Sequence, residues 1–274
     1  MILFTSDLDR TLIYSKKMME TYPGQEALPA VPVEHNRGEI ITFMSDKSIN
    51  LLKEFHEKHL FVPVTTRAFY QYERIRIFQD EIKPKFAICN NGGTILIDGK
   101  VDSEWEKIIL GRLATTALPK QDILKEFAKI RHQDWVEKEF LVDDFFYVFH
   151  VNKDRVPHAE LAGFETELQK LGWKTFLHGR KLYILPISLE KAFAVRQLKT
   201  YLDYDLHIAA GDSLMDYKMI AEADIGYSPL HGELFEFKGN DASAKVTWLT
   251  QNGAASTEEL LTNILKKQNT SKTR

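Results

Sequence analysis

The sequence of 274 residues has a formal net charge of −3, with 44% hydrophobic and 27% charged residues. This composition is typical of a soluble globular protein and excludes disordered and fibrous classes. The small net charge and scattered basic residues give no field that would attract nucleic acid or an anionic membrane, and no apolar run approaches the roughly 20 residues of a membrane helix. The single cysteine, Cys89, cannot form an internal disulfide, so we expect a cytoplasmic protein with no nucleic-acid or membrane partner.

The first hundred residues are predicted to alternate between strand and helix. Short apolar runs indicate buried strands, and apolar residues at helical spacing after Ser45 and Asp46, two candidate caps, indicate a helix between the first two of these strands. The turn signal Asp98-Gly99 then predicts an antiparallel hairpin. The predicted elements in order are a strand at 2–5, a helix at 49–59, a strand at 60–64, a helix at 70–78, a strand at 86–89 and the hairpin 94–101.

The middle of the chain is predicted to form an α+β unit of its own, after which strand and helix alternate again. This unit has helices at 121–131 and 158–171 with strands at 145–151, 174–177 and 181–185. The later elements are a helix at 189–202, a strand at 206–210, a helix through 219 and a strand at 224–227. The expected fold is therefore α/β, a Rossmann-like parallel sheet formed by residues 1–112 and 187–274 with an inserted α+β cap at 113–186.

Polar side chains follow four of the predicted parallel strands. Because sites in parallel sheets form outside the carboxyl ends of the strands, these residues are expected to share one crevice. Several carboxylates brought together would not all stay ionised alone, so the cluster predicts a divalent cation, and an oxygen-rich ligand set without His or Cys favours Mg²⁺. The residues concerned are Asp7, Asp9, Thr65, Asn91, Asp212 and Asp216.

These residue types suit the transfer of a phosphoryl group. In this interpretation Asp7 is a nucleophile that attacks phosphorus, and Asp9 is the acid and base that protonates the leaving oxygen and then activates water. Thr65 would donate a hydroxyl hydrogen bond and Lys191 would supply positive charge to the transferring group. Each assignment has a plainer alternative, since Lys191 alone is typical of a solvated lysine, Asp216 suits a helix cap, and Asn91 suits a turn.

Four ordered motifs resemble those of the haloacid dehalogenase (HAD) superfamily. They are the stretch 7–11 (Asp-Leu-Asp-Arg-Thr), Thr65 after an apolar strand, Lys191, and the stretch 211–216 (Gly-Asp-Ser-Leu-Met-Asp). The insertion resembles the type II cap of the Cof-like, sucrose-phosphatase-like and mannosyl-phosphoglycerate-phosphatase-like branch, and 91–93 resembles the Asn-Gly-Ala turn of that branch. The resemblance implies Mg²⁺ bound by the Asp7 carboxylate, the Asp9 backbone carbonyl and Asp212, with Asp216 in support.

Three departures from the family pattern stand out. Arg10 replaces a common glycine, and Thr66 replaces the glycine of Thr-Gly-Arg, which leaves open whether Thr65 or Thr66 contacts phosphate. The segment 14–45 is longer than expected after the first motif. Its Pro23-Gly24, Pro29 and Pro32 indicate a loop, followed by a strand at 39–44, and the segment is a candidate flap over the site.

The resemblance implies a phosphatase that hydrolyses a small phosphomonoester, with a sugar phosphate favoured by the type of cap. Asn91, Arg67 and Arg180 are the candidate substrate-binding residues. Two alternatives stay open: phosphohexomutase-like transfer on the same core, and a catalytically silent ligand-binding module on the HAD scaffold. We expect a monomer or weak homodimer, and we expect the polar, basic residues from 266 onward to form a frayed terminus.

Overall fold

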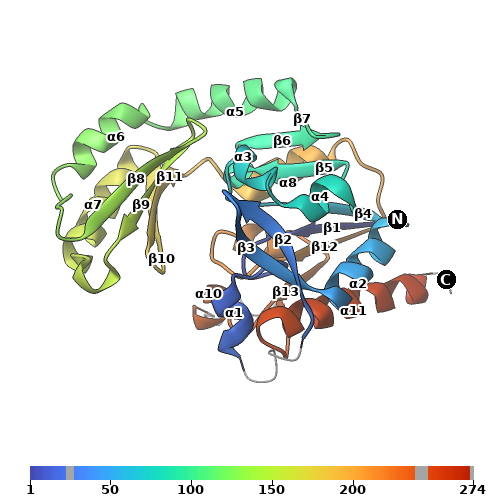
Figure 1. The fold of residues 1–274 in the computed structure, drawn as a ribbon. Helices are drawn as coiled ribbons and strands as arrows, with labels where there is room; N and C mark the ends of the chain where they lie inside the picture. Colours follow the sequence, from blue (N-terminus) through green and yellow to red (C-terminus); the bar gives the residue numbers. More distant parts are fainter. Residues whose placement is uncertain (23–27, 238–245, 272–274) are drawn as a thin grey trace. The chain divides into compact units, whose positions relative to one another are not determined.

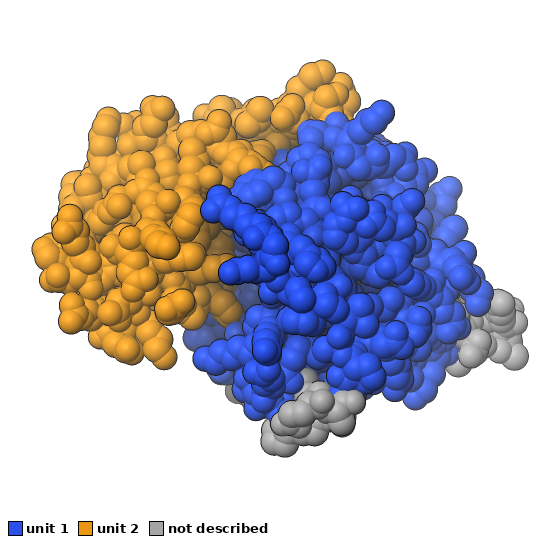
Figure 2. Space-filling view, viewed as in Figure 1, with its two compact units in different colours: residues 1–101, 191–274 blue, residues 102–190 orange. Residues whose placement is uncertain are grey.

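The structure is a computed structural model that describes residues 1–22, 28–237 and 246–271. It divides into two compact units, residues 1–101 with 191–274 and residues 102–190 (Figure 2). The boundaries expected from the sequence were at 112/113 and 186/187, whereas the two units meet at 101/102 and 190/191. No helix in the described part of the chain is long and apolar enough to cross a membrane.

The first unit is built on a sheet of five parallel strands in the order β14-β13-β12-β1-β4. Figure 1 labels β13, β12, β1 and β4. Strand β1 lies between β12 and β4 and pairs in parallel with both, so that Ser6 at its end lies opposite Ala210 and Pro63. The predicted α/β parallel fold is therefore confirmed. The strands are β1 (Ile2–Ser6), β4 (Leu60–Pro63), β12 (Leu206–Ala210), β13 (Ile225–Ser228) and β14 (Val246–Trp248).

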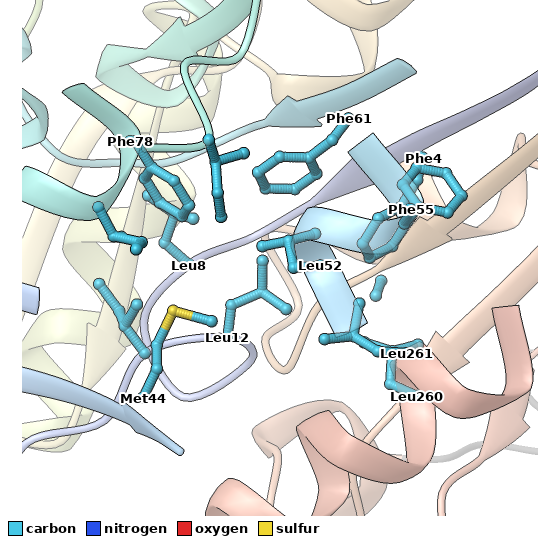
Figure 3. Packing of buried hydrophobic residues seen from close by; sticks show 14 of the residues in the cluster. Phe4, Leu8, Leu12, Met44, Leu52, Phe55, Phe61, Phe78, Leu260 and Leu261 are labelled. Atoms are coloured by element: carbon cyan, nitrogen blue, oxygen red, sulfur yellow. The ribbon is translucent and has the colours of Figure 1, made fainter. Parts of the chain in front are cut away.

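Aromatic and aliphatic side chains of β1 and its neighbouring helices form the core of this unit (Figure 3). The ring of Phe4 on β1 meets Phe55 of α2 edge-on, with centroids 5.8 Å apart, and Phe61 of β4 at 5.7 Å. Helix α2 also packs against α11, whose Leu260 and Leu261 are fully buried in the same cluster. The two helices are α2 (Asp46–His56) and α11 (Gly253–Ser271).

A second, antiparallel sheet continues beyond β4. A single parallel bridge joins Val64, after β4, to Ile88 of β5. Strand β5 then pairs antiparallel with β6, and β6 with β7, which confirms the hairpin predicted at Asp98-Gly99. The elements are β5 (Phe86–Cys89), the 3₁₀ turn η1 (Asn90–Gly92), β6 (Thr94–Ile97) and β7 (Lys100–Val101).

The long segment after the first motif contains a hairpin that the sequence revealed only in part. Strand β3 (Glu39–Ser45) matches the predicted strand, but the stretch with Pro32, expected as a loop, is strand β2 (Ala30–Asn36). Proline is compatible with this two-stranded ribbon because neither strand is enclosed by others. Helix α1 (Lys16–Thr21) precedes the hairpin, and Pro23-Gly24 lies outside the described residues.

The second unit is an antiparallel sheet in the order β10-β11-β9-β8 with three helices. Strand β8 was not predicted, because its run Val-Glu-Lys-Glu lies at the sheet edge, exposed after Val136, and lacks apolar alternation. Helix α5 was also missed. The elements are α5 (Ser103–Thr116), α6 (Lys120–Phe127), β8 (Val136–Val142), β9 (Phe146–Val151), η2 (Lys153–Arg155), α7 (His158–Lys170), β10 (Trp173–His178) and β11 (Lys181–Pro186).

Three predicted boundaries in the first unit were wrong. The helix expected at 70–78 is two short helices, the one expected at 189–202 is shorter, and the end of the chain, expected to fray from 266, is helical in α11 through Ser271. A run of buried leucines and an isoleucine in α11 supplies the core contacts that hold it in place. The remaining helices are α3 (Phe69–Tyr72), α4 (Arg76–Asp80), α8 (Lys191–Lys199), α9 (Tyr217–Ala221) and α10 (Glu233–Glu236).

Candidate active site

Three acidic residues meet at the carboxyl ends of β1 and β12. Asp7 directly follows β1, and its backbone N–H donates to Ala210 O at 2.9 Å, which continues the parallel pairing by one residue. Asp212 and Asp216 lie in the loop between β12 and α9. All three are buried, and one carboxylate oxygen from each lies within 4.8 Å of the others. The sheet register thus brings together residues more than 200 positions apart.

Lys191 is a buried cation that pairs with two members of this cluster, Asp7 and Asp216. Its Nζ donates to Asp7 Oδ1 at 2.5 Å and to Asp216 Oδ1 at 2.6 Å, and the side chain is 1% exposed. Burial by itself would lower the pKa of Lys191, but Asp216 and Asp7 outweigh it and raise the pKa above its ordinary value. The residue at the first position of α8 is therefore a buried ammonium group rather than a solvated surface lysine.

Asp216 is held by its own loop and by Lys191, not by the helix that follows it. Its side chain does not cap α9. Instead its Oδ2 accepts from Ser213 N at 3.0 Å and from Ser213 Oγ at 2.9 Å. Gly211 leaves the space for this arrangement, because a Cβ there would lie 2.3 Å from Asp216 Cβ. The loop geometry thus requires glycine at 211 and directs the Asp216 carboxylate toward Lys191.

The electrostatics of the cluster fit a divalent cation. Burial, opposed by Lys191 and reinforced by Asp216 and Asp9, raises the pKa of Asp7 to about 7. Burial, with Asp7 and Asp216, also raises the pKa of Asp212 well above its ordinary value. Asp212 Oδ2 is buried and accepts no well-oriented hydrogen bond from the described part of the chain, although Arg10 Nε lies 3.0 Å from it. An all-oxygen set that carries more negative than positive charge is typical of a site for a hard cation such as Mg²⁺.

Arg10, one of the departures from the family pattern described above, contacts both Asp212 and the loop after β13. Its Nε lies 3.0 Å from Asp212 Oδ2, an ion pair, and its Nη2 donates to His231 O at 2.7 Å. The backbone at Arg10 adopts a φ of 64°, a left-handed conformation that glycine reaches without strain. The backbone here thus has a conformation that favours glycine, yet the residue carries an arginine side chain beside the acidic cluster.

Asp9 is not a member of the buried triad. Its side chain is half exposed, and its two oxygens accept from Arg67 Nε and Nη2, each at 2.7 Å. The third Arg67 nitrogen, Nη1, lies 2.8 Å from Glu34 Oε2. The structure thus brings Arg67 to Asp9, and Glu34 is a neighbour that the sequence analysis missed. Glu34 lies in the segment 14–45, which was predicted to begin as a loop, and it belongs to no recognised motif.

The two threonines after β4 have different surroundings. Thr65 is buried, its Oγ1 accepts from Arg67 N at 3.1 Å, and its carbonyl oxygen accepts from Asn91 N at 3.0 Å. Thr66 Oγ1 lies 3.8 Å from Met215 Sδ, in the loop after β12. Asn91 is buried in η1 at a φ of 54°, a left-handed conformation that asparagine tolerates. Arg180 lies in the second unit, in the turn between β10 and β11.

Comparison with known protein families identifies the family to which this chain belongs. The family model for sucrose-6F-phosphate phosphohydrolase matches residues 1–260. The chain belongs to this family. It is therefore a HAD-superfamily phosphatase of the sucrose-phosphatase-like branch, which hydrolyses phosphomonoesters, as the four ordered motifs predicted. The comparison with curated proteins gives no match.

Solved structures share the fold of this family member over nearly the whole chain. The sucrose-phosphatase of Synechocystis sp. PCC6803, in complex with sucrose and phosphate, is 14% identical with a TM-score of 0.65, covering 96% of this chain and 97% of its own. Protein 0175 of Thermoplasma acidophilum is 15% identical, TM-score 0.61, covering 96% and 98%. The HAD subclass IIB sugar phosphatase BT4131 is 12% identical, TM-score 0.62, covering 96% and 99%. These likenesses show the fold.

Proposed function

We propose that this chain is a Mg²⁺-dependent phosphatase that hydrolyses a small sugar phosphate through an aspartyl-phosphate intermediate. The observation that carries the proposal is the buried cluster of Asp7, Asp212 and Asp216 around Lys191. The sugar phosphate is supported by the name of the matching family and by the Synechocystis sucrose-phosphatase, which was solved with sucrose and phosphate.

Asp7 and Asp9 divide the chemistry in this proposal. A carboxylate oxygen of Asp7 attacks phosphorus, the bond from phosphorus to the sugar oxygen breaks, and the carboxyl group of Asp9 protonates that oxygen. Asp9 then takes a proton from water, which attacks the aspartyl phosphate, releases inorganic phosphate and restores Asp7. The half exposure of Asp9 suits this role, because the group must reach both a leaving sugar and a water molecule.

The other residues hold the reacting groups. Mg²⁺ bound by Asp7, Asp212, Asp216 and the Asp9 carbonyl would supply positive charge to the transferring phosphoryl group. Lys191 favours the ionised form of Asp7 and holds the side chain in place through its 2.5 Å contact. Thr65 would donate its hydroxyl to phosphate.

The substrate is proposed to be recognised by residues outside the acidic cluster. Asn91 and Arg180 are candidate contacts for the sugar, and Arg67, whose nitrogens contact Asp9 and Glu34, would act there through Asp9. The second unit, which corresponds to the predicted cap, would select the sugar.

A panel of sugar phosphates tests the proposal. With Mg²⁺, the wild-type protein should release inorganic phosphate from at least one hexose or disaccharide phosphate, and Asp7→Asn should release none. Asp80→Asn, which changes an exposed aspartate paired with Arg76, is the matched control and should behave as wild type.

Two results would contradict the proposal. Conversion of a hexose 1-phosphate to the 6-phosphate without phosphate release would identify a mutase. Substrate binding without turnover across the whole panel would identify a silent ligand-binding module.

A further inference from the structure

Glu34 of the β2–β3 hairpin is a fully buried carboxylate placed between two arginines. Its Oε1 accepts from Arg74 Nη2 at 2.9 Å and from Arg74 Nε at 3.2 Å. Its Oε2 lies 2.8 Å from Arg67 Nη1 and accepts from Thr42 Oγ1 at 3.2 Å. Glu34 is 0% exposed. Both oxygens are thus engaged, and charges alternate along the series Asp9, Arg67, Glu34, Arg74.

The backbone of the hairpin is shaped to hold Glu34 there. The register between β2 and β3 shifts on both sides of Glu34, which marks an irregularity of the β-bulge kind at this residue. Bulges re-aim a side chain and are frequent beside active sites. A backbone bridge from Glu34 to Ile75, just before α4, ties the same point to the core. The side chain therefore comes from a hairpin fixed at this residue on two sides.

The geometry at Arg67 shows what Glu34 can do. The guanidinium group is planar, so the direction of its Nε/Nη2 fork is set once its third nitrogen is held. That fork makes two contacts of 2.7 Å to Asp9, while Nη1 contacts Glu34. Arg67 is 12% exposed and Glu34 is fully buried, whereas Asp9 is half exposed. Glu34, the buried carboxylate, is thus in a position to fix the orientation of the half-exposed Asp9 through Arg67.

We propose that Glu34 is a positioning residue that, through Arg67, orients the Asp9 carboxyl group for proton transfer to the leaving oxygen. This inference rests on the proposed phosphatase function and assigns a role to the hairpin in the long segment after the first motif. Proton transfer by a placed side chain contributes about 10²- to 10⁴-fold to rate. A residue that only stabilises the fold would affect every substrate alike, whereas one that positions the acid affects those substrates whose leaving oxygen needs a proton.

The test compares two leaving groups in a Glu34→Gln variant. A sugar phosphate leaves as an alkoxide and needs the proton, whereas p-nitrophenyl phosphate leaves as a stabilised phenolate and does not. We expect Glu34→Gln to lower kcat/KM about tenfold or more for the sugar phosphate and to leave kcat/KM for the aryl phosphate within about threefold of wild type. Most of the loss should be in kcat, because Glu34 makes no substrate contact in this proposal.

Arg74→Met is the matched control. It removes the other arginine from Glu34 but leaves the contacts from Glu34 to Arg67 and from Arg67 to Asp9. Its ratio of kcat/KM between the two substrates should equal that of wild type, even if the variant is less stable. Equal losses on the two substrates in Glu34→Gln, or the same change of ratio in Arg74→Met, would overturn the role of Glu34.

Two further results separate the possible failures. If Glu34→Gln does not fold, Arg67→Lys tests the same link, since one ammonium group cannot bind Asp9 through a fork and also reach Glu34. Arg67→Lys should lower the ratio of kcat/KM for the sugar phosphate to kcat/KM for the aryl phosphate. An unchanged ratio would overturn the inference. A wild-type protein that hydrolyses neither phosphate in the presence of Mg²⁺ would instead overturn the proposed function itself.

Discussion

Replacing Asp7 by asparagine is expected to stabilise the metal-free protein at neutral and alkaline pH. Burial raises the pKa of Asp7 from 3.8 to about 7, even though Lys191 opposes the shift. Above pH 7 this carboxyl group is ionised in the folded and the unfolded protein, and the difference in pKa corresponds to about 4 kcal/mol of destabilisation. Asparagine has a similar shape and no charge, so Asp7→Asn removes most of this penalty.

The pH dependence of stability follows from the sign of the same shift. The folded protein binds the Asp7 proton more tightly than the unfolded chain does. The stability of wild type therefore falls as pH rises from about 4 to about 7, and the contribution of Asp7 to the free energy of unfolding is constant above about pH 7. The free energy of unfolding of Asp7→Asn should therefore exceed that of wild type by about 4 kcal/mol at pH 8 and by about 2 kcal/mol at pH 5.

Urea unfolding in EDTA at the two pH values measures this difference. Asp80→Asn serves as control, because Asp80 is half exposed and pairs with Arg76. Its free energy of unfolding should stay within about 1 kcal/mol of wild type at both pH values. A variant Asp7→Asn that is less stable than wild type at pH 8, or equally stabilised at pH 5 and pH 8, would refute the interpretation of the acidic cluster as destabilising without its cation.

Three other perturbations test the cluster. Lys191→Met leaves Asp7 and Asp216 buried without their shared cation, and urea unfolding at pH 8 should show a loss of about 3–5 kcal/mol. Gly211→Ala places a Cβ 2.3 Å from Asp216 Cβ and should abolish the rise in Tm on adding Mg²⁺, whereas Gly163→Ala, where a Cβ meets nothing within 4 Å, should keep it. In wild type the Mg²⁺-induced rise in Tm should be larger at pH 8 than at pH 5, because protons compete with the cation for Asp7; calorimetry that finds equal rises would contradict this.

The sequence predicted the parts of the fold and site that depend on local pattern. Short apolar runs located β1, β4 and β12, and Asp7 and Asp212, which follow two of these strands, come together because parallel register aligns carboxyl ends. Strand β8 and helix α5 escaped prediction for a different reason. Much of their surface is exposed, so their stability comes from pairing and packing that apolar periodicity does not report.

Glu34 shows the limit of such reasoning at the site itself. A single glutamate two residues after Pro32 carries no local signal, and its role depends on a bulge in one hairpin, an arginine from the β4–α3 loop and another after α3. Arg67 was predicted as a substrate contact because a motif marks it, but its partners were not. The chemical identity of a site residue can thus be predicted from sequence, whereas the direction in which it points requires tertiary contacts.

The buried acidic cluster links stability to function in this family member. Asp7 and Asp216 share the Lys191 ammonium group beside the end of β1, Asp212 pairs with Arg10, and the pKa values of Asp7 and Asp212 are raised because burial disfavours their charged forms. A chain selected only for stability would place neutral or paired groups there. The parallel register of β1 and β12 and the glycine at 211 instead keep these groups in place. The excess negative charge that destabilises the metal-free protein is therefore what would give the site its affinity for a divalent cation.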